Sequence, residues 1–324
     1  MTEERRTTCE ICGDDGKKRS HRVREMMLGT RDEFTYVHCS NCDSLTLSHP
    51  PDALADYYPD NYYSYTDNPE AMNALRRFAH IVRGRYLVLG QLGFLGRLVA
   101  EFFPDRNIES LSPLKLHPSM SIVDIGCGAG KLAWTLAAIG FEHVLGIDPM
   151  IEGDYKYDNG ARILKQNMYE LEGSFDVVML HHSFEHMCEP LRVLEQIRRL
   201  LTDTGVCLIT TPNLSSEAWD IYGSDWVQID APRHLFVHSV RSLSVLASRA
   251  GLAIERVEWN STEFQYWGSE QYRRDIPLTD QRSYVRNPSK SVFSRSDIRM
   301  YRSRAEKANG AERGDQIAVY LRCN

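Results

Sequence analysis

The sequence of 324 residues lacks any apolar run that approaches 18 residues, the minimum length of a membrane-spanning helix. Its first residues (MTEERR) lack the apolar segment of a signal peptide. It has no excess of positive charge, because 38 Lys and Arg stand against 44 Asp and Glu, which argues against a general binder of nucleic acid or anionic membranes. We therefore expect a cytoplasmic protein with no membrane span, whose eight cysteines are reduced or bound to metal. The sequence indicates no oligomeric state.

Residues 121–130 (SIVDIGCGAG) are the most informative segment that is present. An apolar strand runs into glycines at positions 126, 128 and 130, and a helix is expected from Lys131. Glycine tolerates positive φ and lets the backbone approach a ligand, and a helix start offers unpaired N–H groups. A dinucleotide fingerprint would need glycine where Lys131 stands, and a P-loop would need a longer gap followed by Ser or Thr. A nucleoside site for S-adenosylmethionine is the third alternative, which Asp124 favours.

The segments that follow alternate between strands and helices. Asp148 ends a second strand (143–147), where an acid can accept both hydroxyls of a ribose. Asn167 and Met168 follow a third strand (161–164), where they are candidates to read an adenine edge. A fourth strand (174–180), a helix (190–201) and a fifth strand (206–210) continue the series. This alternation predicts a parallel sheet covered on both faces by helices.

These residues resemble the class I S-adenosylmethionine-dependent methyltransferases over roughly residues 120–260 and again over 316–321. The resemblance implies an α/β fold with a Rossmann-like, seven-stranded, mostly parallel sheet and S-adenosylmethionine as cofactor. One departure is Asn167, where the family more often has aspartate. The residues that the resemblance implies for cofactor binding are Asp124, Gly126, Cys127, Gly128, Gly130, Asp148, Pro149, Asn167, Met168 and His181.

Two C-x2-C pairs near the N-terminus predict a metal site. Cys9 with Cys12 and Cys39 with Cys42 are separated by 26 residues, which a β-hairpin with strands at 23–28 and 34–37 would span. Four thiolates suit tetrahedral Zn²⁺ and leave no position open for a substrate, so we expect a structural ion. The alternative is four unrelated buried thiols.

Three regions follow from these patterns. Residues 1–65 form a small zinc-ribbon-like module that ends in a Tyr-rich segment (57–65), which either closes over the site or packs between modules. Residues 66–118 form a helical linker, with helices expected at 71–83 and 94–103. Residues 119–324 form the methyltransferase domain, with a polar insertion at 260–314.

The combination of zinc pairs, Tyr-rich segment, residues 182–186 (HSFEH) and residues 230–235 (DAPRHL) sharpens the resemblance. With this combination, the chain is similar to bacterial methyltransferases of surface-polysaccharide, nucleotide-sugar and secondary-metabolite pathways. The resemblance implies methyl transfer to a small-molecule or glycan-type acceptor, most often a hydroxyl.

A hydroxyl acceptor needs a base, and histidine is the usual choice near neutral pH. His182 and His186 follow the fourth strand and would face the glycine loop across the cleft. His234 lies at the tip of a loop whose Arg233 is a candidate to clamp a phosphate or carboxylate. These three histidines are the catalytic candidates; a metal site that includes Glu185 is a minor alternative. The competing functions are an RNA methyltransferase with a zinc module, which the acidic composition disfavours, and a non-catalytic binding protein with a degenerate cofactor site.

Overall fold

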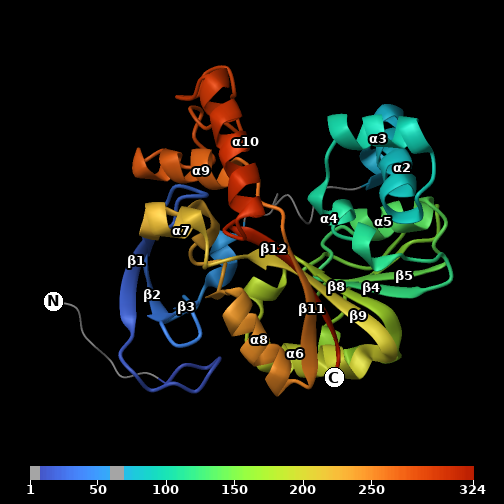
Figure 1. The fold of residues 1–324 in the computed structure, drawn as a ribbon, viewed down its shortest axis with the longest axis horizontal. Coiled ribbons are helices and arrows are strands. Elements are labelled where there is room, and N and C mark those ends of the chain that lie inside the picture. The colour runs from blue at the N-terminus through green and yellow to red at the C-terminus, as the bar shows by residue number, and fades with distance from the viewer. Residues whose placement is uncertain (1–7, 59–68) are drawn as a thin grey trace.

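The computed structural model describes residues 8–58 and 69–324, and its centre is an eight-stranded sheet (Figure 1). In this sheet, β12 (Gln316–Cys323) and β6 (Tyr155–Lys156) run antiparallel to their neighbours, and the other strands run parallel to one another. The seven expected strands are all present, and the two-residue strand β6 adds an eighth at the edge. The order is β11 (Leu252–Trp259), β12 (Gln316–Cys323), β9 (Leu201–Pro212), β8 (Phe175–His181), β4 (Ser121–Ile125), β5 (His143–Ile147), β7 (Arg162–Leu164) and β6 (Tyr155–Lys156).

Side chains that alternate along these strands build a core on each face of the sheet. In β4, Val123 belongs to one buried cluster and Ile122 to the other, and in β9 Cys207 and Leu208 divide in the same way. The first cluster is covered by α6 (Pro190–Leu200) and α8 (Val240–Arg249), and the second by α5 (Lys131–Ala138) and α4 (Arg106–Glu109), on opposite sides of the sheet in Figure 1. The predicted two-sided α/β fold is confirmed.

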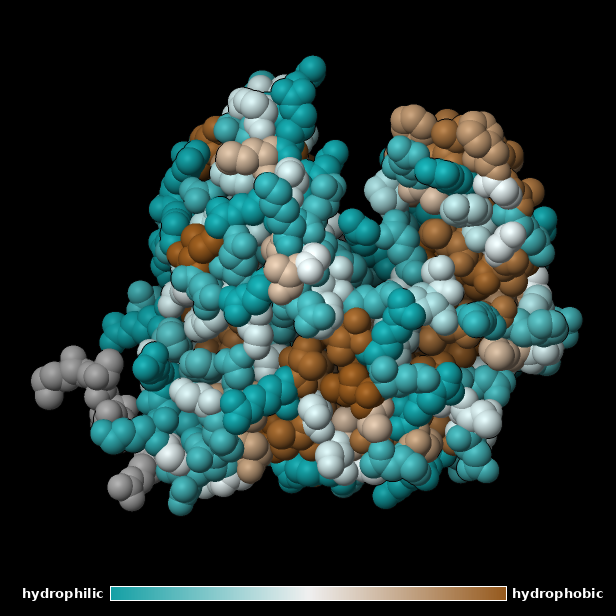
Figure 2. Space-filling view, in the orientation of Figure 1, coloured by the Kyte–Doolittle hydropathy of each residue, from teal (hydrophilic) through white to brown (hydrophobic). Residues whose placement is uncertain are grey.

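A helical hairpin of α2 (Ala74–Leu89) and α3 (Gly93–Phe102) lies above α5, where helices were expected. Asn73 caps α2 by accepting the Arg76 N–H at 2.9 Å, and Gly90 ends it in the left-handed conformation. Apolar side chains of this hairpin remain exposed, and Figure 2 shows them as the brown area at the top right. The exposed residues are Leu75, Phe78, Leu92, Phe94, Leu95 and Phe102.

The N-terminal residues form a second sheet of four strands, β1 (Arg19–Arg24), β2 (Glu33–Cys39), β3 (Ser44–Leu47) and β10 (Phe236–Val237). The first strand spans Arg19–Arg24 instead of the expected 23–28, so only residues 23 and 24 were placed correctly. It ends at Arg24 because the Glu25 carboxylate accepts the N–H groups of residues 28–30 and holds the chain in a turn. β10 comes from the methyltransferase part of the chain, and its Val237 pairs with Leu45 of β3. The N-terminal sheet is therefore completed by a distant segment.

The insertion between β11 and β12 carries α9 (Phe264–Arg273) and α10 (Arg295–Gly310), while α7 (Glu217–Tyr222) follows β9. These three helices lie together over the N-terminal sheet in Figure 1. Within residues 8–58 and 69–324, we find no helix with the length and apolar character needed to cross a membrane.

Candidate active site and metal centre

The loop between β4 and α5 forms one wall of a cavity. Gly126, Gly128 and Gly130 have φ angles of 74°, 54° and 74°, where other residues are strained. A Cβ on Gly126 would lie 2.5 Å from the Cβ of Ser183, and one on Gly130 would lie 2.1 Å from the Cδ1 of Ile163. Packing behind the loop therefore requires glycine at two of these positions.

Two buried carboxylates lie beside this loop. Asp148 follows β5, and its oxygens accept the N–H groups of Gly128 at 2.9 Å and Met150 at 2.8 Å. Asp124 of β4 is buried, and its Oδ1 has no hydrogen-bond partner in the described part of the chain. Burial, together with the charge of Asp148, raises the pKa of Asp124 to about 7. A buried acceptor without a partner beside a cavity indicates a ligand that donates hydrogen bonds.

The cavity has a volume of about 600 Å³ and lies between the glycine loop and the segment after β8. This size suits a nucleoside-type ligand. Nine of the predicted site residues line it, and they come from the ends of three neighbouring strands, β4, β5 and β8. They are Asp124, Gly126, Cys127, Gly128, Asp148, Pro149, His181, His182 and His186.

Four other predicted residues do not line this cavity. Gly130 packs against Ile163, Met168 is buried in the core, and His234 lies behind His186. Asn167 caps a short 3-10 helix (Met168–Glu170), because its Oδ1 accepts the Tyr169 N–H at 3.1 Å. The expected contacts of Asn167 and Met168 with adenine stay a prediction.

The strand β8 delivers two histidines to the cavity. The ring of His181 is held by a 3.2 Å contact between its Nδ1 and the Thr210 hydroxyl, and burial lowers its pKa to about 3. His182 has a φ of 50°, which is uncommon for a residue other than glycine, and its N–H bonds the Thr210 carbonyl at 2.9 Å. This strained backbone directs the imidazole of His182, whose side chain is 35% exposed, to the cavity.

A second pair of histidines surrounds Glu185, which is fully buried. The rings of His186 and His234 lie edge to face, with centroids 4.7 Å apart. The Nδ1 of His186 donates to the Arg233 carbonyl at 2.8 Å, and the Nδ1 of His234 donates to the Gln228 carbonyl at 2.8 Å. The structure thus brings the three candidate histidines together around one carboxylate, with only His182 and His186 on the cavity wall.

Comparison with known proteins places this chain in a family. A family described as "Methyltransferase domain" matches residues 95–257, half of the chain. The chain belongs to this methyltransferase family. The match supports the expected methyltransferase activity, while the expected domain bounds (119–324) stay a prediction. The matched segment contains the glycine loop, Asp148 and the Glu185 histidine cluster, although not the N-terminal cysteines.

Curated relatives of this chain include proteins named as O-methyltransferases. The "Ubiquinone biosynthesis O-methyltransferase" of Maricaulis maris is 28% identical over 160 residues, which are 44% of this chain and 59% of that protein. The protein of the same name from Cereibacter sphaeroides is 30% identical over 149 residues, 42% of this chain and 58% of that one. The match thus spans less than two thirds of the length of these relatives.

Solved structures with a similar chain path include the cyclopropane synthase MmaA2 from Mycobacterium tuberculosis. It is 13% identical, with a TM-score of 0.44, and the match covers 82% of this chain and 99% of that one. Another is the O-methyltransferase of a trans-AT polyketide synthase from Brevibacillus brevis, solved with S-adenosyl-L-homocysteine. It is 13% identical, with a TM-score of 0.42, and the match covers 74% of this chain and 79% of that one.

Arg233 of the methyltransferase domain corrects one expectation. The side chain was a candidate to clamp a substrate anion, but it is fully buried. Its guanidinium donates to Asp230 at 2.6 Å and to Glu25 of the N-terminal sheet at 3.1 Å. Two carboxylates already satisfy this cation, so Arg233 joins two parts of the fold and does not face the cavity.

Other cavity residues had weaker signals in the sequence. Tyr58, from the Tyr-rich segment, lines the cavity, and its hydroxyl lies 3.1 Å from the Nδ1 of His186. Tyr57 packs against Phe34, which belongs to the same expected module (1–65), so this contact does not show packing between modules. Residues 59–65 of the segment lie outside the described residues. Sequence patterns did not single out Leu54, Asn107, Leu132, Met150 or Met187 of the lining.

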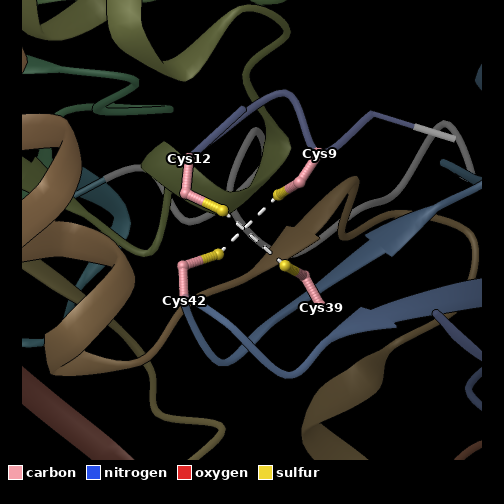
Figure 3. Close-up of side chains that lie close together, drawn as sticks. All are labelled: Cys9, Cys12, Cys39 and Cys42. Atoms are coloured by element: carbon pink, nitrogen blue, oxygen red, sulfur yellow. Dashed lines mark hydrogen bonds between the residues drawn. The ribbon is translucent and has the colours of Figure 1, made fainter. Parts of the chain in front are cut away.

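The four N-terminal cysteines converge on one point, as Figure 3 shows. The Sγ atoms of Cys9 and Cys42 are 3.7 Å apart, as are those of Cys12 and Cys39. Such distances exclude disulfides, and they match the sulfur separation of about 3.8 Å that a tetrahedral Zn²⁺ with 2.3 Å bonds requires. Asn41 donates to the Cys12 Sγ at 3.4 Å, a contact that supports a thiolate.

Proposed function

We propose that this protein transfers the methyl group of S-adenosylmethionine to a hydroxyl of a small-molecule acceptor. The observation that carries the proposal is the single cavity lined both by the glycine loop with its two carboxylates and by His182 and His186. A cofactor site and a set of candidate bases thus share one cavity. S-adenosylmethionine supplies the reactive methyl group on a cationic sulfur.

The residues of the glycine loop side hold the cofactor in this proposal. The Asp148 carboxylate has lone pairs left for ribose hydroxyls beyond the two N–H bonds that fix it. Asp124 offers to a donor or a cationic group its Oδ1, which has no partner within the described residues. Cys127 and Pro149 complete the lining. Gly130, Asn167 and Met168 contribute by shaping this side.

In this proposal, the side of the cavity lined by His182 and His186 binds and deprotonates the acceptor. His182 accepts the hydroxyl proton while the oxygen bonds to the methyl carbon, and the carbon–sulfur bond breaks with its electron pair on sulfur. His186 contacts the acceptor at the cavity wall. His234 does not reach the cavity and positions His186 through their edge-to-face contact. Alignment of the acceptor and exclusion of water supply much of the rate.

We propose a sugar, nucleotide-sugar or other glycan-pathway hydroxyl as the acceptor, on the sequence patterns described above. The relatives named for ubiquinone biosynthesis favour a second class, a hydroxylated intermediate of that pathway. We further propose that Cys9, Cys12, Cys39 and Cys42 bind one structural Zn²⁺, because their sulfur geometry fits the ion.

The test begins with S-adenosylhomocysteine binding by calorimetry. Asp148→Asn should weaken binding by roughly 10- to 150-fold, the equivalent of 1.5–3 kcal/mol for hydrogen bonds to a charged group. No binding to the unaltered protein at millimolar ligand would refute the proposal.

The acceptor side is tested with labelled S-adenosylmethionine and a panel of nucleotide-sugars, hydroxylated quinone precursors and RNA. With an acceptor in hand, His182→Ala should lower turnover by ~10²–10⁴ and leave cofactor affinity unchanged. His143→Ala, which alters an exposed histidine of β5, should match the unaltered protein in both measurements. Equal turnover of the two variants would exclude His182 as the base.

A further inference from the structure

The Glu185 carboxylate is the most unusual buried group outside the proposed cofactor site. The residue follows β8 on a 3-10 helix (Phe184–His186), and it is 0% exposed. Neither of its oxygens has a hydrogen-bond partner in the part of the chain that the structure describes. Burial of an anion without hydrogen bonds costs several kcal/mol, so the position needs a compensating cation.

The nearby arginine does not supply that cation. Arg233 lies in the same loop as His234, but its guanidinium bonds Asp230 and Glu25 instead. The groups next to the carboxylate are imidazoles. The Nδ1 of His182 lies 3.5 Å, and the Nε2 of His234 lies 3.9 Å, from Oε1 of Glu185.

The tautomers of two histidines are set by the backbone. A carbonyl oxygen only accepts, so the 2.8 Å contacts with the Gln228 and Arg233 carbonyls place a proton on the Nδ1 of His234 and of His186. The neutral rings therefore carry their lone pair on Nε2. A histidine whose other nitrogen bonds a backbone carbonyl in this way is oriented as metal-ligating histidines are.

We propose that Glu185, His186 and His234 bind a divalent transition-metal ion, separate from the zinc at the four cysteines. One ligand atom from each of the three residues lies within 4.8 Å of the others. Ligand atoms around an ion with bonds of about 2.1 Å lie roughly 3–4 Å apart, so the side chains close by about 1 Å when it binds. Two imidazoles and one carboxylate suit Zn²⁺, Mn²⁺, Fe²⁺ or Co²⁺.

The proposed ion would lie beside the cavity, where it can bind the acceptor. This role of the ion rests on the proposed function. His186 is the ligand that lines the cavity, whereas Glu185 and His234 lie behind it. Three protein ligands leave coordination positions open on the cavity side, where an acceptor with two neighbouring oxygens can bind. Coordination makes a hydroxyl easier to deprotonate, and His182, which is not a ligand in this scheme, takes the proton.

The experiment measures Mn²⁺ binding to the full-length, zinc-loaded protein by the loss of the free Mn²⁺ signal in electron paramagnetic resonance. Mn²⁺ prefers nitrogen and oxygen ligands, so it discriminates against the cysteine cluster. We expect one Mn²⁺ per chain. Glu185→Gln and His186→Gln should each weaken binding at least tenfold, whereas Glu189→Gln, the same change on an exposed side chain, should leave it unchanged.

Binding of S-adenosylhomocysteine to each variant shows that the fold is kept and reports separately on the proposed function. His186, only half-buried, is the variant that keeps the test informative if Glu185→Gln does not fold. The proposal is overturned if the unaltered protein binds neither Mn²⁺ nor Co²⁺, or if folded His186→Gln binds Mn²⁺ as tightly as the unaltered protein.

Discussion

Asp124 and Asp148 are neighbouring carboxylates that differ in their hydrogen bonding. Both oxygens of Asp148 accept backbone N–H groups, whereas Oδ1 of Asp124 has no hydrogen-bond partner among residues 8–58 and 69–324. Burial raises the pKa of both, and that of Asp124 reaches about 7. Asp124 therefore changes charge near neutral pH, next to the space where a cationic cofactor is proposed to bind.

This difference predicts a pH dependence of cofactor binding. As pH rises from 5 towards 7, Asp124 loses its proton, and affinity for cationic S-adenosylmethionine should rise by up to about tenfold per pH unit because one proton is released. Asp124→Asn should bind weakly, with a flat profile over this range. Calorimetry in buffers of different ionisation enthalpy counts the proton; a steep profile that persists in Asp124→Asn would assign the titration to another group.

The same raised pKa opposes folding at higher pH. The unfolded chain releases the Asp124 proton near pH 4 and the folded chain near 7, so the native state binds more protons between these values. The contribution of Asp124 to stability therefore falls as pH rises across this window.

Individual site residues were predictable from sequence when their partners are local. Asp148 lies just after a strand and close to the glycine loop, and it occupies the expected place. Arg233 was misassigned although one of its carboxylate partners, Asp230, is only three positions away; the other, Glu25, which ties the side chain to the N-terminal sheet, is 208 positions away. A contact between residues so far apart leaves no periodic pattern in the sequence. From sequence alone, a buried arginine in a loop therefore cannot be told from one that binds a substrate anion.

At the scale of elements, the seven expected strands of the central sheet were predictable. For β4, β5, β8 and β9 the reason is that buried parallel strands are continuous apolar runs. The strands β6 and β10 were not, because each has two residues, too few to show a pattern. β10 also depends on pairing with β3, a segment far away in the sequence. The sequence therefore indicated the methyltransferase sheet, but not the attachment of the N-terminal sheet to it.

The contact between the glycine loop and β7 carries a prediction about packing. In Gly130→Ala the new methyl group would overlap the Ile163 side chain, at a φ of 74° that disfavours alanine. We expect a loss of about 2–4 kcal/mol in the free energy of unfolding, measured by urea denaturation. Gly153→Ala, at a position with open space and no positive φ, should change stability by less than about 0.5 kcal/mol.

Ile163→Ala alone should also destabilise the protein, because this side chain is fully buried. In the double variant with Gly130→Ala, the loss should be smaller than the sum of the two single losses, since the overlapping atoms are gone while the backbone strain stays. An additive double variant would mean that the two residues do not interact, contrary to their contact.

At the scale of the whole molecule, the N-terminal sheet and the methyltransferase sheet share one core. Tyr36 of β2 and Leu45 of β3 belong to the same buried cluster as Val123 and Val178 of the central sheet. The Tyr36 hydroxyl donates to the His234 carbonyl at 2.8 Å, so this contact reaches the proposed acceptor side. The N-terminal sheet is thus tied to the rest of the molecule by β10, Arg233 and Tyr36.

This continuity makes a prediction for loss of the proposed zinc. Cys39→Ser removes one thiolate ligand, and because the N-terminal strands complete a common core, the whole protein should lose stability. We expect its single melting transition to fall by at least roughly 10 °C, which corresponds to about 3–5 kcal/mol for a chain of this size. Calorimetric scans with and without S-adenosylhomocysteine identify the transition that includes the cofactor site.

Cys188→Ser, which changes an exposed cysteine outside the cluster, should melt as the unaltered protein does. If Cys39→Ser instead gives two transitions, and the ligand-sensitive one is unshifted, the N-terminal sheet is an independent unit and its contacts with Arg233 and β10 contribute little to the stability of the cofactor site.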